Sequence, residues 1–223
     1  MLTPDEWEAV RLTLVVAARS VGLGLPVAIL AAAAMRRRFP GRAALELVLH
    51  LPLVLPPVVT GWLLLLVFGV HGPVGRWLLA WFGVRLAFTT AGASLACAVM
   101  TFPVMVRAIR LALDAVDPGL EQAARTLGAG RWDRFCTITV PLALPGVLTG
   151  AALAYATSLG EFGAVITFAA DIPGQTRTLP LAIYAALQSP GGEAVAARLS
   201  LVSVALALAG LGAAEWLGRR RRP

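Results

Sequence analysis

The chain has 223 residues, of which 58% are hydrophobic, and its mean hydropathy is +0.79. Because roughly half of an ordinary soluble domain is apolar, this composition excludes a soluble globular protein and predicts one that lies in a lipid bilayer. The net charge of +7 comes from arginine alone. The absence of lysine excludes the Gly-Lys-Ser/Thr sequence of a nucleotide-binding P-loop.

Five apolar segments are each long enough to cross a bilayer, which takes about 20 residues per helix. They cover residues 12–35, 47–70, 87–109, 145–170 and 199–217. We therefore predict an all-α, polytopic membrane protein in which residues 1–223 form a single transmembrane domain. Residues 110–142 are a polar interruption between the third and fourth segments.

Arginine clusters follow the first, third and fifth segments. Their members are Arg36, Arg37, Arg38 and Arg42, then Arg107, Arg110, Arg125, Arg131 and Arg134, and finally Arg219, Arg220, Arg221 and Arg222. Basic residues favour the cytoplasmic side of a membrane, and five crossings put all three clusters on one side. We therefore place the N-terminus outside and residues 110–142 in the cytoplasm. Because orientation explains the positive charge, we expect no nucleic acid partner.

Two charged residues lie deep within the apolar segments, away from their ends. Glu161 is in the fourth segment and Arg19 in the first. A bare carboxylate would repel an anionic cargo, so we interpret Glu161 as structural, accepting hydrogen bonds from nearby backbone or hydroxyl groups, or pairing with an arginine of another helix. A pair between Glu161 and Arg19 is one hypothesis. The alternative is that Arg19 extends toward the outer face of the membrane.

The second segment contains three prolines, each of which removes or crowds a helical hydrogen bond. We expect its inner half to be kinked or unwound, and such backbone is tolerated in a membrane only inside protein or beside a water-filled path. The candidate pathway and gate residues are Pro52, Leu53, Val54, Leu55, Pro56, Pro57 and Val58. The alternative is a kink that serves only helix packing.

The polar interruption contains signals for a short helix. Asp117 is a good N-cap, Pro118 suits the first helical position, and Gly128 favours a helix end. A second short amphipathic piece, with Trp132 and Thr139, is expected on the inner membrane surface before the next segment. We predict a protruding elbow that another protein binds. An ordinary helical loop is the alternative.

At these residues the chain resembles a known family. Glu-x-Ala-Ala, followed by Gly and then Pro, is similar to the EAA signature of permease subunits in bacterial ATP-binding-cassette (ABC) importers of type I. The residues implied to couple to the ATPase are Glu121, Ala123, Ala124, Arg125, Gly128 and Pro141. The stretches "LHLPLVLPPVVTG", "SLGEFGAVITF" and "TRTLPLAIY" resemble molybdate permeases. Sulfate permeases share much of the Gly-Glu-Phe-Gly segment.

The resemblance implies a type I importer fold of about five membrane helices with a cytoplasmic coupling helix. It implies the permease subunit of a molybdate importer in the bacterial inner membrane, acting as a homodimer with two cytoplasmic ATPase subunits and an external molybdate-binding protein. ATP would be bound by the ATPase, so we expect no cofactor in this chain.

No catalytic set or metal site is expected, because the two histidines, His50 and His71, stand near opposite ends of the second segment. An enzyme is therefore not predicted. Within the family, tungstate and sulfate remain alternatives to molybdate. Outside it, the alternatives are an ATP-independent secondary transporter, which would normally show paired repeats, and a protein that only anchors a partner.

Overall fold

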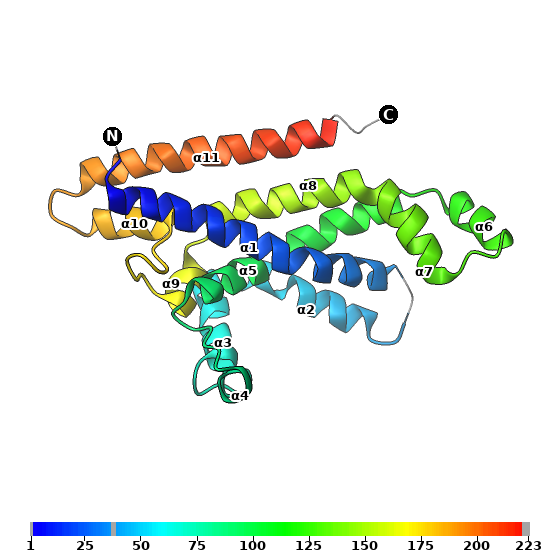
Figure 1. Cartoon of the computed structure of the whole chain (residues 1–223), viewed down its shortest axis with the longest axis horizontal. Coiled ribbons are helices and arrows are strands. Elements are labelled where there is room, and N and C mark those ends of the chain that lie inside the picture. Colours follow the sequence, from blue (N-terminus) through cyan, green and yellow to red (C-terminus); the bar gives the residue numbers. More distant parts are fainter. Residues whose placement is uncertain (1, 37–38, 220–223) are drawn as a thin grey trace.

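The computed structural model describes residues 2–36 and 39–219, with side chains up to residue 212. The described part is helical, and Figure 1 shows the helices in chain order. Their bounds are α1 (Pro4–Met35), α2 (Arg42–Val54), α3 (Pro57–Phe68), α4 (Pro73–Phe82), α5 (Thr90–Asp114), α6 (Pro118–Thr126), α7 (Arg131–Arg134), the π-helix η1 (Phe135–Thr139), α8 (Val140–Leu159), α9 (Gly163–Ala169), α10 (Leu179–Leu187) and α11 (Glu193–Arg219). Arg37, Arg38, Arg220, Arg221 and Arg222, which support the predicted orientation, lie outside the described residues.

Four long helices form the bundle: α1, α5, α8 and α11 run along its length (Figure 1). The described residues contain four helices long and apolar enough to cross a membrane, or five if the bent pair α2 and α3 counts as one span. Helix α5 packs against both α1 and α8, and α11 packs against α8. Small residues allow the close approach that membrane helices favour, as where Gly150 of α8 meets Ala108 of α5.

The first span starts earlier than its apolar residues predict. Helix α1 begins at Pro4, not near residue 12, because Thr3 and Glu6 form a reciprocal capping box at its N-terminus. Glu6 is buried and also accepts a hydrogen bond from Arg198 of α11. The polar first turns of α1 are therefore tied to the start of the last helix.

The second predicted span, residues 47–70, is broken between α2 and α3, which confirms the kink expected from its prolines. The chain bends by 118° between helices α2 and α3. Leu55 has an extended backbone with ψ of 141°, and Pro56 follows with ψ of 134°. The residue before a proline is pushed out of the helical region, so consecutive prolines at 56 and 57 force the break. Pro52, in contrast, is accommodated inside α2.

The fourth predicted span, residues 145–170, is wrong as a single helix. Helix α8 already starts at Val140 and ends at Leu159, and α9 is a separate short helix after the turn at Gly160. Figure 1 shows α9 beside the start of α3. A Cβ at Gly61 of α3 would lie 2.7 Å from the carbonyl oxygen of Ala164, and one at Gly163 of α9 would lie 2.7 Å from Cβ of Pro57. Helices α3 and α9 thus approach each other closely at Gly61 and Gly163.

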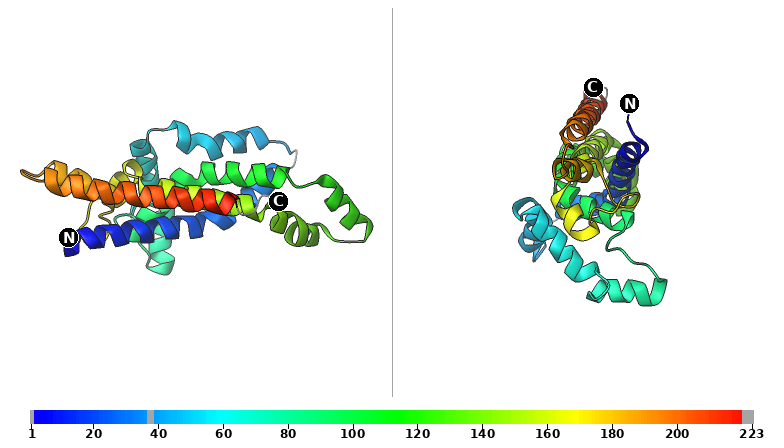
Figure 2. Two further views of the ribbon diagram at one scale, coloured as in Figure 1. Left: turned by 90° about the horizontal axis from the view of Figure 1, so that it is seen from above. Right: turned by 90° about the vertical axis from the view of Figure 1, so that its left-hand side faces the viewer.

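Two parts extend beyond the bundle. Figure 2 shows that α3 and α4 leave it sideways, while α6 and α7 project from one end. We call residues 117–134 the elbow. Its second half is not a separate surface helix, because α7, η1 and α8 form one continuous helical run from Arg131 to Leu159.

The glycine contact between α3 and α9 generates a stability prediction. Gly61→Ala should lower the thermal unfolding midpoint of the detergent-solubilised protein, because overpacking typically costs about 1–3 kcal/mol. Gly22→Ala is the matched control, since a Cβ there meets nothing within 4 Å. Equal midpoints for the two variants would contradict the close approach of α3 and α9.

Candidate functional site: the elbow and its anchor

Helix α6 begins and ends as its local sequence requires. The Asp117 carboxylate accepts a hydrogen bond from the Gly119 N–H at 2.8 Å, and Pro118 occupies the first helical position. After the last turn, Gly128 adopts a left-handed φ of +86°. Its N–H bonds to the Arg125 carbonyl oxygen, and the Ala129 N–H bonds to that of Ala124. This pair of bonds is the Schellman arrangement that satisfies the final carbonyl groups of a helix.

One face of α6 is apolar and exposed. Leu120, Ala123, Ala124 and Leu127 follow one another at spacings of three, one and three residues, which places them along one side of a helix. The Leu127 side chain is 87% exposed, Leu120 and Ala123 are exposed, and Ala124 is half-buried. An exposed apolar stripe on a short helix in solvent is a feature typical of a surface that binds another protein.

Glu121 holds the other side of α6 against the bundle. Its Oε1 accepts a hydrogen bond from Nη1 of Arg36, at the end of α1, at 3.1 Å. The same oxygen accepts one from the Thr139 hydroxyl, at the end of η1, at 2.8 Å. The Glu121 carbonyl oxygen also accepts from Nη1 of Arg134 at 3.3 Å. Glu121 therefore connects α6 to three neighbouring elements.

A chain of ion pairs extends from this point across the end of the bundle. Arg36 lies 3.5 Å from the Asp114 carboxylate at the end of α5. Arg110 contacts Asp114 at 3.7 Å and the Glu46 carboxylate of α2 at 2.8 Å. The ends of α1, α2 and α5 are thus joined electrostatically to α6. A cavity of about 350 Å³ beside the cluster is lined by Arg36, Glu121, Arg131, Arg134 and Thr139 among others.

The surroundings of Glu121 favour its charged form. Partial burial alone raises the pKa of this carboxyl group. The hydrogen bonds from Thr139 and Arg36 and the positive charges of Arg36 and Arg134 outweigh burial, so the net result is a pKa below the ordinary value. The glutamate is therefore ionised at neutral pH.

The π-helix η1 presents Thr139 to Glu121. The Val140 N–H bonds to the Phe135 carbonyl oxygen, five residues back, just before Pro141. Because Pro141 has no N–H, the helix cannot form its usual bond there, and a π-turn is a frequent local solution at functional sites. Sequence reasoning missed Thr139 and Arg36 as partners of Glu121. The proline was the available signal for the irregular turn, whereas nothing local pointed to Arg36.

The remaining predicted coupling residues line the elbow or border it. Arg125 is exposed on α6, and among the described residues it has no ion pair. Pro141 is exposed at the start of α8, beyond η1. The predicted residues therefore divide into the anchored Glu121, the helix-modifying Pro141, and a group on or just after α6 that comprises Ala123, Ala124, Arg125 and Gly128.

The candidate gate residues surround the break between α2 and α3. Leu53, Val54 and Val58 are exposed, with Val54 at 81%, so they face away from the interior of this chain. Leu55 and Pro56 form the extended break itself. A pathway lined by these residues would need a second wall from outside the monomer.

The hypothesis that Glu161 pairs with Arg19 is wrong. The Glu161 carboxylate accepts a hydrogen bond from the Ala164 N–H at 3.1 Å, in the first turn of α9. Arg19 is exposed on α1 and forms no ion pair within the described part of the chain. Glu161 thus bonds to nearby backbone, which is the structural interpretation favoured from the sequence.

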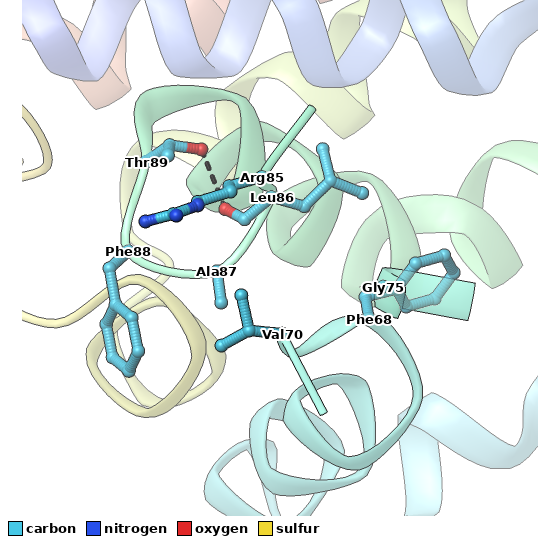
Figure 3. Close-up of a pocket in the computed structure, with 8 residues that line it drawn as sticks. All are labelled: Phe68, Val70, Gly75, Arg85, Leu86, Ala87, Phe88 and Thr89. Atoms are coloured by element: carbon cyan, nitrogen blue, oxygen red, sulfur yellow. Dashed lines mark hydrogen bonds between the residues drawn. The ribbon is translucent and has the colours of Figure 1, made fainter. Parts of the chain in front are cut away.

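A second cavity, of about 280 Å³, lies far from the elbow at the N-terminus of α5. Figure 3 shows the residues around it, including Arg85 and the N-cap Thr89, whose hydroxyl donates to the Leu86 carbonyl oxygen at 2.7 Å. Most of its lining is apolar, and Arg85 is exposed. This cavity is therefore mainly apolar, unlike the cavity beside Glu121 at the elbow.

The fold is that of the membrane subunits of ABC importers. The structure aligns with a chain of the bacterial alginate ABC transporter crystallised in complex with an alginate pentasaccharide-bound periplasmic protein, with a TM-score of 0.76 over 98% of this chain and 80% of that one, at 19% identity. The MetNI methionine ABC transporter in an inward-facing conformation gives a TM-score of 0.69 over 98% and 94% of the two chains, at 18% identity. The predicted fold class is confirmed.

The sequence comparisons identify the family more specifically than the fold does. Residues 24–223 match the family described as binding-protein-dependent transport system inner membrane component, and the chain belongs to this family. It is 58% identical to the molybdenum transport system permease protein ModB of Escherichia coli K12, over 100% of this chain and 97% of that protein. The ModB of Haemophilus influenzae is 51% identical over 96% and 94% of the two chains. The sulfate transport system permease CysT of Escherichia coli K12 is 39% identical over 77% and 62%.

These comparisons confirm four predictions. The chain is a permease subunit of the inner membrane, and its role is transport rather than catalysis. The resemblance to molybdate permeases extends over the whole chain. The family also connects the chain to a transport system that depends on a binding protein.

The lowered pKa of Glu121 generates a pH prediction. A carboxylate whose pKa falls on folding stabilises the fold above its unfolded pKa, close to the ordinary 4.5, and this stabilisation is lost as the pH falls through the folded value. Glu121→Gln should therefore lower the thermal unfolding midpoint near neutral pH, and its difference from the wild type should shrink below pH 4.5. Glu193→Gln, at an exposed carboxylate, is the control. A difference that persists unchanged at acid pH would contradict the ionic anchor.

Proposed function

We propose that this chain is the permease subunit of an ATP-driven molybdate importer of the bacterial inner membrane. The observation that carries the proposal is its full-length identity of 58% to a molybdenum permease. The sulfate alternative has weaker support, since the sulfate permease is 39% identical over part of the chain. Membership of a binding-protein-dependent family gives no support to a secondary transporter or a mere anchoring protein.

The proposed complex contains two copies of this chain, two cytoplasmic ATPase subunits and an external molybdate-binding protein. The exposed stripe of α6, made by Leu120, Ala123, Ala124 and Leu127, supports docking of an ATPase at the elbow. The exposed residues at the break between α2 and α3 support a pathway between two copies, because one chain supplies only one wall. ATP is bound by the ATPase, since this chain has no lysine for a P-loop.

The proposed mechanism is alternating access. Closure of the ATPase dimer on ATP draws the two elbows together, and the attached helices turn to open the pathway outward. Hydrolysis of ATP on the partner restores the inward-facing state. The permease itself holds its cargo weakly, because tight binding in a pathway would prevent release. Apolar side chains such as Leu53 and Val58 would close the path when it is not conducting.

Docking through α6 is tested with two variants, one that places a negative charge on the exposed stripe and one that places it on the other side of the helix. Ala123→Asp should weaken co-purification of the ATPase and decrease ATP-driven uptake by about tenfold or more, as expected at the centre of an interface. Gln122→Asp is the matched control, because this exposed neighbour faces away from the stripe at about 3.6 residues per turn. Equal effects of the two substitutions would count against docking on the stripe.

The cargo is tested with the complete importer in proteoliposomes. ATP inside the vesicles and the binding protein outside should drive accumulation of molybdate, and excess tungstate should compete, because the two tetrahedral dianions are nearly equal in size whereas sulfate is smaller. Excess sulfate should compete less. Accumulation without ATP, or a preference for sulfate over molybdate, would overturn the proposed function.

A further inference from the structure

We infer that Arg36 and Thr139 are positioning residues that transmit the movement of α6 to the membrane helices, by holding the Glu121 carboxylate between α1 and α8. The inference rests on the proposed function, in which α6 receives the movement of an ATPase. It assigns to Glu121 a contact inside the permease, on the side of α6 that faces the bundle.

The geometry supports a single attachment point. Among the described residues, α6 has no buried member, and the hydrogen bonds that reach it from other elements end on Glu121. Arg36 Nη1 and the Thr139 hydroxyl both donate to the same oxygen, Oε1. A displacement of α6 therefore pulls on the end of α1 and on the start of α8 together.

Arg36 is suited to this role because it binds on two sides. Its guanidinium group donates through Nη1 to Glu121 and lies with Nε 3.5 Å from Asp114 of α5. A planar guanidinium presents several donors in a fixed arrangement, which an ammonium group does not. The Arg36 side chain is 25% exposed, so water screens these contacts only partly.

The arrangement separates transmission from stability. Partly exposed ion pairs contribute little to the stability of a fold, and the bundle packs through α1, α5 and α8 away from this point. Removing the Arg36 side chain should therefore leave the bundle folded and the docking stripe intact, while α6 loses its hydrogen bond to the end of α1. Movement of the ATPase would then reach the membrane helices less efficiently.

The test measures molybdate uptake per ATP hydrolysed by the complete importer in proteoliposomes. Arg36→Gln and Thr139→Val should each lower this ratio by roughly threefold or more, with co-purification of the ATPase retained. Thr139→Ser keeps the hydroxyl and should behave like the wild type. Arg110→Gln is the matched control, because Arg110 joins Glu46 to Asp114 without contacting α6.

A second measurement uses the permease alone. A spin label at Gln122→Cys, in a Cys136→Ser background, should become more mobile when Arg36→Gln or Thr139→Val is added, and not with Arg110→Gln. Cys97 is buried and does not compete for the label. This measurement also covers the case in which one of the two variants fails to fold, since the other tests the same contact.

The outcomes separate the two proposals. No ATP-driven molybdate uptake by the wild type would overturn the proposed function. Wild-type uptake with an unchanged ratio in both Arg36→Gln and Thr139→Val would overturn the present inference alone. An equal fall of the uptake ratio in Arg110→Gln would also overturn it, because loss of any ion pair at this end of the bundle would then have the same effect. An immobile label in every variant would show that Glu121 does not hold α6.

Discussion

Backbone groups inside a bilayer have no water to bind, and this constraint determines where the helices of this protein are allowed to break. The chain interrupts its helices at Leu55–Pro56 and again at Gly160–Phe162. The two interruptions are brought together, since the helices that follow them, α3 and α9, pack through Gly61 and Gly163. Glu161 satisfies one backbone group at the second interruption, because its carboxylate accepts a hydrogen bond from the Ala164 N–H at the start of α9. The helices that follow the two breaks thus pack closely against each other.

At the other end of the bundle, charged groups replace apolar packing. The elbow buries no side chain of α6, and its position depends on a few hydrogen bonds to Glu121. A helix held in this way moves as a unit more readily than one embedded in a core, because few contacts must be exchanged. The same helix exposes its apolar stripe to a partner, with Leu127 at 87% exposure. Its two sides therefore serve different purposes, one for attachment to the bundle and one for recognition.

Features set by one or two neighbouring residues could be predicted from the sequence. Asp117 and Pro118 start α6, Gly128 ends it, and Pro56 and Pro57 break the second span, because each acts on its own backbone. The anchor could not be predicted in this way, since Arg36 is 85 residues and Thr139 is 18 residues from Glu121. The break at Gly160–Phe162 was missed because no proline marks it, and the apolar residues on both sides suggested one span. The structure shows Glu161 bonded to the Ala164 N–H and Arg19 exposed on α1, a choice of partner that the sequence left open.

Helix α8 connects the two ends of the molecule. It begins at Val140, directly after the threonine that binds Glu121, and it ends at Leu159, directly before the turn that leads into α9. Helix α9 contacts α3 at Pro57, which is one of the candidate gate residues. A continuous helix changes its length little, so a shift at its first turn is carried along its axis to the last. On the proposed mechanism, movement of the elbow therefore reaches the break between α2 and α3 through α8 and α9, with no need for a change of structure inside the bundle.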